Sequence, residues 1–318
     1  MANANYTVKN VDSFIITGFD HLQNQKLLGF LILLTYMLIL LGNSINLCII
    51  LTARHLHKPM YILICNLAVV DIMYSTTCST TMISVLLVEI KTVSYYSCIS
   101  RAFFYHLGDG TECLALTLMA LDRFIAIRFP LRYHSIVTNS RVILLILLTW
   151  VVGFGVMAAI ISVADSLPYC QPVIRYVFCE DPSLLRAACV DPEPYFFMTI
   201  MLSLWLMFGQ LPFILCTYAV VAYSVTKLSN TSSKKQMINT CLSHLIVLFS
   251  YYGPKVVSIL LTRIGVVLTL TERNALLIAS SLIPPLVNPT VYSIRTKEIR
   301  KRLADVFGGK KKFSTNSS

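Results

Sequence analysis

The sequence predicts an all-α membrane protein: a bundle of seven transmembrane helices followed by a short amphipathic eighth helix. The 318-residue chain is 56% hydrophobic and 13% charged, with a mean hydropathy of +0.71. A soluble domain is far less apolar. The apolar runs are about 20 residues long, the length that a helix needs to cross the hydrocarbon core of a bilayer. Runs of this length favour helices over the alternating ten-residue strands of membrane barrels.

Seven such runs account for most of the chain, and the connections between them are short. We expect the spans at about 27–52, 60–88, 97–127, 141–162, 196–225, 237–262 and 271–293. This division gives an extracellular N-terminal segment (1–26), one seven-helix receptor domain (27–293) and a cytoplasmic eighth helix and tail (294–318). The last span contains three prolines, which membrane helices tolerate because neighbouring helices satisfy the freed carbonyls.

The distribution of lysine and arginine predicts the orientation. One set of connections holds sixteen Lys/Arg residues and two acidic residues. The other set holds eight Lys/Arg residues and nine acidic residues. The basic set is 53–58, 128–141, 226–236 and 294–318, and the other set is 1–26, 89–101, 162–195 and 263–273. Cytoplasmic loops carry the excess of positive charge. The N-terminus is therefore expected outside and the C-terminus inside. The net charge of +11 is then assigned to the inner membrane face, so a nucleic-acid partner is not expected.

The N-terminal segment has no apolar stretch long enough for a cleavable signal, so we expect the first span to act as the anchor. Asn5 begins an Asn-Tyr-Thr glycosylation sequon on the predicted outer side. The sequons at Asn230 and Asn316 fall on the predicted inner side and should stay unmodified.

Four of the ten cysteines occupy predicted outer positions: Cys98, Cys170, Cys179 and Cys189. Thiols that face an oxidising compartment indicate two disulfides, and three pairings are compatible with four cysteines. The loop 162–195 is long enough to fold over the mouth of the bundle, where two disulfides would hold it.

Six charged residues within the predicted spans are singled out as candidates. They are Asp71, Asp109, Glu112, Asp122, Arg123 and Lys255. An ionisable side chain at bilayer depth costs about 2.5–3.5 kcal/mol on insertion scales, so each is a candidate functional residue. The alternative for each is a satisfied structural pair that faces the bundle interior. Asp122 and Arg123 lie at the cytoplasmic end of the third span, where the arginine can pair locally or be released, as in a two-state switch.

Two further groups of polar residues suggest sites inside the bundle. Asp71 and Glu112 lie at similar depth, and Asn43 and Asn288 offer further oxygen ligands. A sodium site and a purely structural hydrogen-bonded network both fit this group. Nearer the outer side, Asp109 and Lys255 either neutralise each other or contact a ligand.

Five motifs in order along the chain resemble the odorant receptors, a branch of the rhodopsin-like G-protein-coupled receptors, and the general character of the sequence resembles fish members. Phe124 replaces the common tyrosine after Asp-Arg, and Arg128-Phe129 replaces the usual Cys-His, although the arginine of the switch is retained. The motifs are Gly42-Asn43, Leu56-His-Lys-Pro-Met-Tyr61, Met119 to Tyr133, Thr240-Cys-Leu-Ser-His-Leu245 and Pro285 to Ser293.

The resemblance implies a multi-pass plasma-membrane receptor that binds a small odorant and activates a heterotrimeric G protein through a stimulatory olfactory-type α subunit that raises cAMP. It implies disulfides between Cys98 and Cys179 and between Cys170 and Cys189. The activation switch would comprise the residues that match the family motifs. These are Asp122, Arg123, Tyr218, His244, Asn288, Pro289 and Tyr292. The exposed inner cleft would accept the C-terminal helix of the α subunit.

The predicted ligand contacts lie in the outer half of the third and sixth spans. They are His106, Asp109, Tyr252, Lys255 and Arg263. His106 and Arg263 fall where the acid-binding subgroup of odorant receptors carries a histidine and an arginine, and a guanidinium binds a carboxylate with two hydrogen bonds. The resemblance therefore suggests an anionic ligand, whereas an ionised, unpaired Asp109 would favour an amine, so a zwitterion also fits.

Other function classes have less support. An enzyme is not expected because neither a Ser-His-Asp arrangement nor metal-ligand spacing is present, and no cofactor is expected apart from the sodium ion considered above. A transporter is disfavoured by the absence of an internal repeat, and an opsin by the absence of a lysine in 271–293. A rhodopsin-like receptor for a non-odorant mediator is the remaining alternative, which expression in olfactory neurons would separate.

Overall fold

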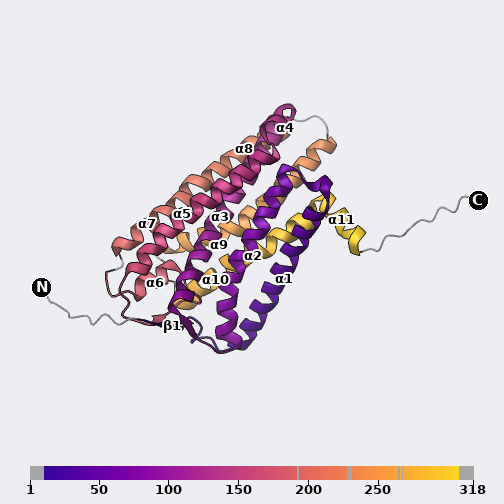
Figure 1. The fold of residues 1–318 in the computed structure, drawn as a ribbon. Helices are drawn as coiled ribbons and strands as arrows, with labels where there is room; N and C mark the ends of the chain where they lie inside the picture. Colours follow the sequence, from indigo (N-terminus) through magenta and orange to yellow (C-terminus); the bar gives the residue numbers. More distant parts are fainter. Residues whose placement is uncertain (1–10, 192, 228–230, 264–265, 267, 308–318) are drawn as a thin grey trace, which may run out of the picture.

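The protein is an elongated helical bundle in the computed structural model (Figure 1). The structure describes residues 11–191, 193–227, 231–263, 266 and 268–307. Seven long helical segments cross the bundle in this part of the chain, at positions close to those predicted. They are α1 (Gln25–Thr52), α2 (Pro59–Leu87), α3 (Tyr95–Arg128), α5 (Asn139–Ser166), the continuous segment α7 (Glu193–Leu204), η3 (Trp205–Gln210) and α8 (Leu211–Thr226), then α9 (Thr231–Arg263) and α10 (Leu270–Arg295).

Five of these segments are long and apolar enough to cross a membrane: α1, α2, α5, Phe208–Thr226 and α10. The segments α3 and α9 fall short of that criterion. Charged side chains of α3 and α9, including Asp109 and Lys255, face each other inside the bundle rather than outward. The prediction of an all-α transmembrane bundle is confirmed, with these two segments distinguished by their polar inner faces.

Short elements complete the two ends of the bundle. The amphipathic helix α11 (Lys297–Phe307) follows α10, as predicted, and its Ile299 is fully buried against the core. The other short helices are η1 (Arg54–Leu56), η2 (Pro130–Arg132), α4 (Tyr133–Ile136) and α6 (Asp181–Ala187). Figure 1 shows α6 at one end of the bundle and α4 and α11 at the other. We call the end with α6, where a small β-sheet also lies, the sheet end, and the opposite end the α4 end.

A three-stranded sheet at the sheet end was not predicted. Its central strand β1 (Ser13–Ile16) pairs antiparallel with β2 (Thr92–Ser94) and parallel with β3 (Val173–Ile174). Phe14 and Ile16 of β1 are fully buried in the core of this end. The strands are two to four residues long, too short for a local sequence pattern to reveal, and exist only because three distant segments meet.

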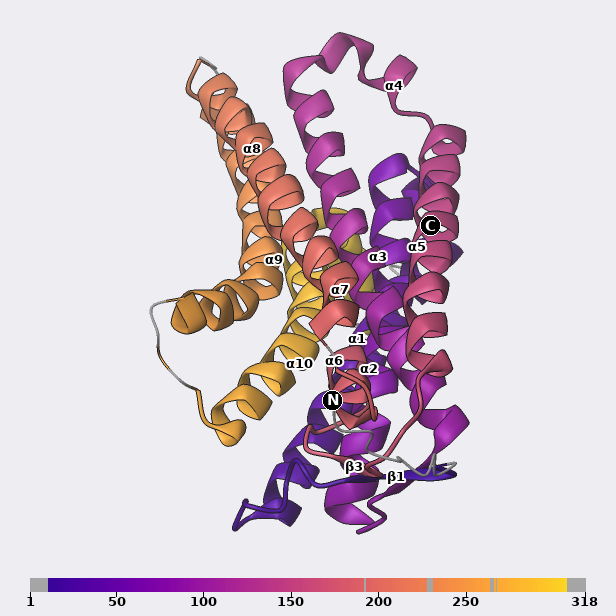
Figure 2. The same ribbon diagram turned by 90° about the vertical axis from the view of Figure 1, so that its left-hand side faces the viewer.

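The centre of the bundle is α3, which packs on α2, α5 and α8. Trp150 of α5 donates a hydrogen bond of 2.8 Å to Asn66 of α2, which joins these two helices. Figure 2 shows α8 and α9 separating from α3 and α5 toward the α4 end, whereas α9 and α10 lie together in the middle of the bundle and diverge toward the sheet end. The two apolar cores, one at each end, leave a polar layer between them.

Candidate functional site: an inner pocket, a buried polar layer and an arginine switch

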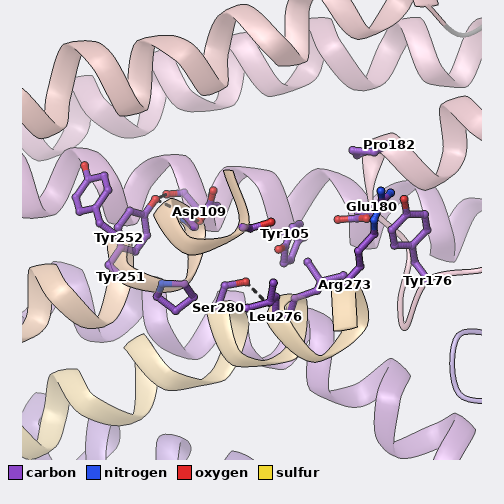
Figure 3. Close-up of a pocket in the computed structure, with 14 residues that line it drawn as sticks. Tyr105, Asp109, Tyr176, Glu180, Pro182, Tyr251, Tyr252, Arg273, Leu276 and Ser280 are labelled. Atoms are coloured by element: carbon purple, nitrogen blue, oxygen red, sulfur yellow. Dashed lines mark hydrogen bonds and ion pairs between the residues drawn. The ribbon is translucent and has the colours of Figure 1, made fainter. Parts of the chain in front are cut away.

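A cavity of about 380 Å³ lies near the sheet end of the bundle, between α3, α9, α10 and the loop that carries α6 (Figure 3). We call it the inner pocket. Four tyrosines, two serines, prolines, leucines and four charged residues line it: Tyr105, Asp109, Tyr176, Glu180, Pro182, Tyr251, Tyr252, Pro254, Lys255, Ser258, Arg273, Leu276, Leu277 and Ser280. A largely pre-formed cavity with a few polar groups is typical of a small-molecule site.

An ion pair between Asp109 and Lys255 lies on one wall of the inner pocket. Tyr251 donates a hydrogen bond to the Asp109 backbone carbonyl at 2.9 Å and to its Oδ1 at 3.2 Å. The Lys255 ammonium also lies 3.5 Å from the centroid of the Tyr251 ring, a cation–π contact. The sequence leaves open whether the two charges pair with each other or with a ligand, and in this structure they pair with each other.

Tyr252 lines the inner pocket beside this ion pair, as predicted. Its hydroxyl lies 2.9 Å from the Cys113 thiol, which is also hydrogen-bonded to Gln210. Gln210 is the last residue of the π-helical segment η3. Sequence reasoning missed Cys113 and Gln210, because neither residue type signals a pocket and the π-helical turn that places Gln210 has no local signature.

Glu180 and Arg273 lie together at the other end of the inner pocket. Figure 3 shows Arg273 reaching from α10 toward Glu180 and Tyr176. Glu180 is 7% exposed, and this burial raises the pKa of its carboxyl to about 7, with Arg186 lowering and Asp181 raising it. Neither residue was predicted, although an acidic residue directly after Cys179 was a signal that could have suggested Glu180.

His106 and Arg263 were predicted to contact the ligand. His106 is not among the residues that line the inner pocket: its Nε2 accepts the backbone N–H of Asp181 at 3.1 Å. The histidine therefore holds the start of α6 beside the pocket. Arg263 is the last residue of α9, and its side chain lies outside the described residues.

A fully buried polar cluster joins α2, α3 and α10 in the middle of the bundle. Asn288 donates hydrogen bonds to both carboxylate oxygens of Asp71, at 3.0 and 3.1 Å, and to Oε1 of Glu112 at 3.2 Å. The second oxygen of Glu112 and the amide oxygen of Asn288 are buried without a partner in the described structure. The structure brings these three residues together. The free carboxylate oxygen of Glu112 can take up a proton, and both unpartnered oxygens are of the kind that ligates a small cation. Among the described residues no group of three His, Cys, Asp or Glu side chains is arranged to hold a metal ion.

Asn43 was predicted to share this cluster but has another role. Its side-chain amide donates to the carbonyl of Pro285 at 3.1 Å and to that of Ile39 at 3.1 Å. Pro289 has no N–H to donate to the carbonyl four residues earlier, and that carbonyl belongs to Pro285. Asn43 therefore satisfies the backbone group that Pro289 leaves free.

Asp122 and Arg123 form an ion pair at the α4 end of α3, with 3.2 Å between Oδ2 and Nη2. Tyr133 donates a hydrogen bond of 2.7 Å to Oδ1 of Asp122, so the carboxylate has two partners. The Asp122 side chain is 3% exposed and that of Arg123 is 16% exposed. Sequence reasoning anticipated the ion pair and did not anticipate Tyr133.

Three more predicted switch residues lie close to this ion pair. Tyr218 of α8 and His244 of α9 are hydrogen-bonded to each other through the tyrosine hydroxyl and Nδ1. Tyr292 of α10 directs its hydroxyl at the sulfur of Met119, 3.7 Å away. The tyrosines thus have partners other than Arg123 in this structure.

Two disulfides close the loop over the inner pocket. Cys98 at the start of α3 bonds to Cys179, and Cys170 bonds to Cys189, with Cα–Cα distances of 5.4 and 5.0 Å. This is the pairing that the resemblance implied. The predicted glycosylation site Asn5 lies outside the described residues.

Comparison with known proteins agrees with this architecture. Residues 32–310 match the olfactory receptor family. The human olfactory receptor 10G4 is 34% identical over 92% of this chain and 93% of its own length. The human olfactory receptor 6N1 is 32% identical over 92% of this chain and 93% of its own length. The mouse olfactory receptor 10D1B is 31% identical over 92% of this chain and 94% of its own length.

The chain belongs to the olfactory receptor family. This olfactory receptor is accordingly an odorant-sensing G-protein-coupled receptor of the plasma membrane, with several membrane spans, and is not an enzyme. Membership implies a small-molecule ligand and coupling to a G protein.

Proposed function

We propose that this receptor binds a small anionic or zwitterionic water-soluble odorant in the inner pocket and activates a stimulatory, olfactory-type G protein that raises cAMP. The charge of the pocket supports this ligand class. Asp109 and Lys255 lie on one wall and Glu180 and Arg273 at the other end. Both pairs of charges line the same cavity of about 380 Å³, so a single ligand can contact both.

The observation that carries the proposal is the Asp109–Lys255 ion pair inside the cavity. A carboxylate ligand can replace Asp109 at the Lys255 ammonium, and an amine can replace Lys255 at the carboxylate, so a zwitterion offers both groups in exchange. A neutral apolar ligand cannot compensate either charge. The hydroxyls of Tyr251, Tyr252 and Ser280 provide further hydrogen bonds that orient a polar ligand.

The proposed orientation places the sheet end outside the cell. The basic connections 53–58 and 128–141 lie at the α4 end, and the predicted excess of positive charge favours that side as cytoplasmic. The α6 loop and its two disulfides then cover the outer mouth, where an oxidising environment maintains them. An odorant would enter from the outer aqueous phase.

We propose that activation releases Arg123 from Asp122. A ligand shifts the receptor only if it binds the active arrangement more tightly than the inactive one. Tyr218 and Tyr292 would exchange His244 and Met119 for Arg123, and the inner cleft would accept the C-terminal helix of the α subunit. Asn288 and Pro289 lie on the same helix as Tyr292, one turn away, and would transmit the shift.

We also propose that a sodium ion or a proton neutralises the buried Asp71–Glu112 cluster. Two carboxylates and the Asn288 amide oxygen supply hard oxygen ligands, and two of these oxygens are unpartnered. The Asn43 amide nitrogen donates to Pro285 and Ile39, which leaves the Asn43 amide oxygen as a further ligand in the proposed ion site. An ion held there would link α2, α3 and α10.

A cAMP-reporter screen of carboxylic acids, amines and amino acids in cells that express the chain tests the ligand and G-protein proposals together. Responses should appear among acids or amino acids and not among matched neutral esters and amides. Arg263→Ala should abolish responses to acids, and a full response in that variant would remove Arg263 from the site. Responses restricted to neutral apolar odorants would contradict the proposed ligand class.

A further inference from the structure

A second cavity, of about 470 Å³, lies beside the inner pocket at the sheet end. Three arginines line it: Arg175 and Arg186 of the loop and Arg273 of α10. Gln171 and Ser183 add polar groups, and none of the described residues that line the cavity is acidic. Three guanidiniums around one cavity without a carboxylate among its lining residues favour an anionic occupant.

We propose that this cavity, the arginine vestibule, is a separate binding site for organic anions, which it captures before they reach the inner pocket. The vestibule would take molecules that carry a carboxylate, sulfonate or phosphate group, because these groups accept paired hydrogen bonds from a guanidinium. The capture step rests on the proposed orientation, which exposes the sheet end to the outer aqueous phase. The binding site itself does not depend on the identity of the G protein.

Arg186 is held in place within the vestibule by Tyr176. Its guanidinium carbon lies 5.6 Å from the centroid of the Tyr176 ring, and its Nη1 donates a hydrogen bond to the tyrosine hydroxyl. A guanidinium that is already stacked and hydrogen-bonded loses less conformational entropy when an anion binds. This arrangement suits a binding site better than an arginine that moves freely in solvent.

The wall that carries Arg175 is also fixed. Arg175 directly follows strand β3, whose pairing with β1 is reinforced by hydrogen bonds between Thr17 and the Ile174 carbonyl. The Cys170–Cys189 disulfide closes the same loop. The exposed Arg175 side chain is therefore presented from a restrained backbone.

Arg273 and Tyr176 line both cavities and so join the vestibule to the inner pocket. Arg273 lies in the first turn of α10, and within the described structure its side chain has no hydrogen bond or ion pair with another residue. Figure 3 shows this side chain extended between Tyr176 and Glu180 at the end of the inner pocket. An anionic group could pass from one cavity to the other while it stays in contact with the same guanidinium.

Two acidic residues near the vestibule have positions outside its lining. Glu272, next to Arg273, accepts hydrogen bonds from the N–H and hydroxyl of Thr269 at 2.7 and 2.8 Å and so stays at the helix terminus. Glu180 lines the inner pocket instead, and its raised pKa of about 7 leaves part of the population neutral at physiological pH.

Direct binding of a trisulfonated fluorescent dye, 8-hydroxypyrene-1,3,6-trisulfonate, to purified receptor in phosphatidylcholine nanodiscs tests the proposal by fluorescence anisotropy. The wild-type receptor should bind the dye, and Arg175→Gln/Arg273→Gln should weaken binding about tenfold or more, because two charge-assisted contacts are lost. Neither side chain has a hydrogen bond or ion pair in the described structure, so this variant should fold. Binding by the wild type should also weaken as salt is raised.

The matched control is Lys26→Gln/Lys91→Gln, which removes two positive charges at the same end of the molecule, from ion pairs with Glu89 and Asp20. This variant should keep wild-type dye affinity, as should Lys255→Gln in the inner pocket. Equal losses in the control and the arginine variant would show a general surface-charge effect and overturn the proposal, as would unchanged binding in the arginine variant. Loss of cAMP responses with normal dye binding would count against the proposed signalling and leave the vestibule intact.

Discussion

The Asn43 side chain donates a 3.1 Å hydrogen bond to the Pro285 carbonyl, the group that Pro289 deprives of its helical donor. Asn43 is 1% exposed, so water cannot replace it. The close approach that this bond requires is made possible by Gly42, where an added Cβ would lie 3.1 Å from the Pro289 ring. Helices α1 and α10 are therefore joined by a side-chain hydrogen bond that replaces the backbone donor missing at Pro289.

Asn43→Ala should destabilise the receptor by about 1–3 kcal/mol, because it leaves a buried carbonyl unsatisfied. Thermal unfolding of purified receptor would measure the loss. In the Pro289→Ala background, which restores the backbone N–H, the same substitution should cost clearly less. An equal loss of stability in both backgrounds would contradict the proposed hydrogen bond from Asn43 to the Pro285 carbonyl.

Lys255→Met should raise the ligand concentration needed for half-maximal response to carboxylic acids and amino acids at least about tenfold, because a charge-assisted bond is lost. Lys255→Arg keeps the charge and should retain most of the response. The cAMP reporter provides the measurement, with surface expression as the control. A response of Lys255→Met that matches the wild type would exclude this lysine from the ligand site.

Asp122→Asn should raise basal cAMP, because Arg123 loses its ionic partner and is released more easily. Arg123→Gln should abolish ligand-driven nucleotide exchange on the G protein. Arg128→Gln, at the end of the same helix, where the arginine lies 5.4 Å from the Phe129 ring, is the matched control and should behave like wild type. Undiminished nucleotide exchange in Arg123→Gln would refute the switch.

Stability should depend on pH through Glu180. Burial raises the pKa of this carboxyl from its ordinary value of 4.5 to about 7, so the folded receptor binds the proton more tightly than the unfolded chain. Stability should therefore fall as pH rises from about 4.5 to about 7 and level off above that, by about 3 kcal/mol in full. The midpoint of thermal unfolding should be lower at pH 8 than at pH 5.5.

Glu180→Gln cannot titrate and is the control for this effect. The difference between its unfolding midpoints at the two pH values should be smaller than in the wild type. Groups that titrate elsewhere contribute equally to both proteins and cancel in the comparison. The same pH difference in both would show that the Glu180 carboxyl is not the source.

Sodium should stabilise the receptor relative to N-methyl-D-glucamine, if the ion occupies the Asp71–Glu112 cluster. An ion that binds only the folded state raises the unfolding midpoint as its concentration increases. Asp71→Asn removes one charged ligand and should abolish this dependence. Identical midpoints in both salts for the wild type would leave a proton as the neutralising species.

Local sequence features account for the helices and for several pairs within the site. Runs of about 20 apolar residues locate the spans because the bilayer itself sets the length. Ionisable residues inside those runs identify Asp109, Lys255 and the Asp122–Arg123 pair, because burial of charge in a membrane is costly unless it is compensated. These signals depend only on composition and position along one chain segment.

Other parts of the site depend on contacts between distant segments. Spacing alone left three disulfide pairings open, and the observed one follows from the position of the loop against the start of α3. Arg273, Glu180 and Tyr176 became candidates only when the loop was seen folded beside α10. His106 was assigned to the ligand from its place on α3, yet the N–H of Asp181, 75 residues away, occupies its free nitrogen.

The sequence by itself determined that the protein is a membrane-embedded helical bundle with charges inside it and with the motifs of an odorant receptor. Hydrophobic length and the cost of buried charge are properties that can be summed along a single segment. Only the tertiary structure decided which charges face one another, that Asn43 serves a proline carbonyl, and that three arginines share one cavity. Those outcomes depend on distances between side chains far apart in the chain, which only the packed bundle defines.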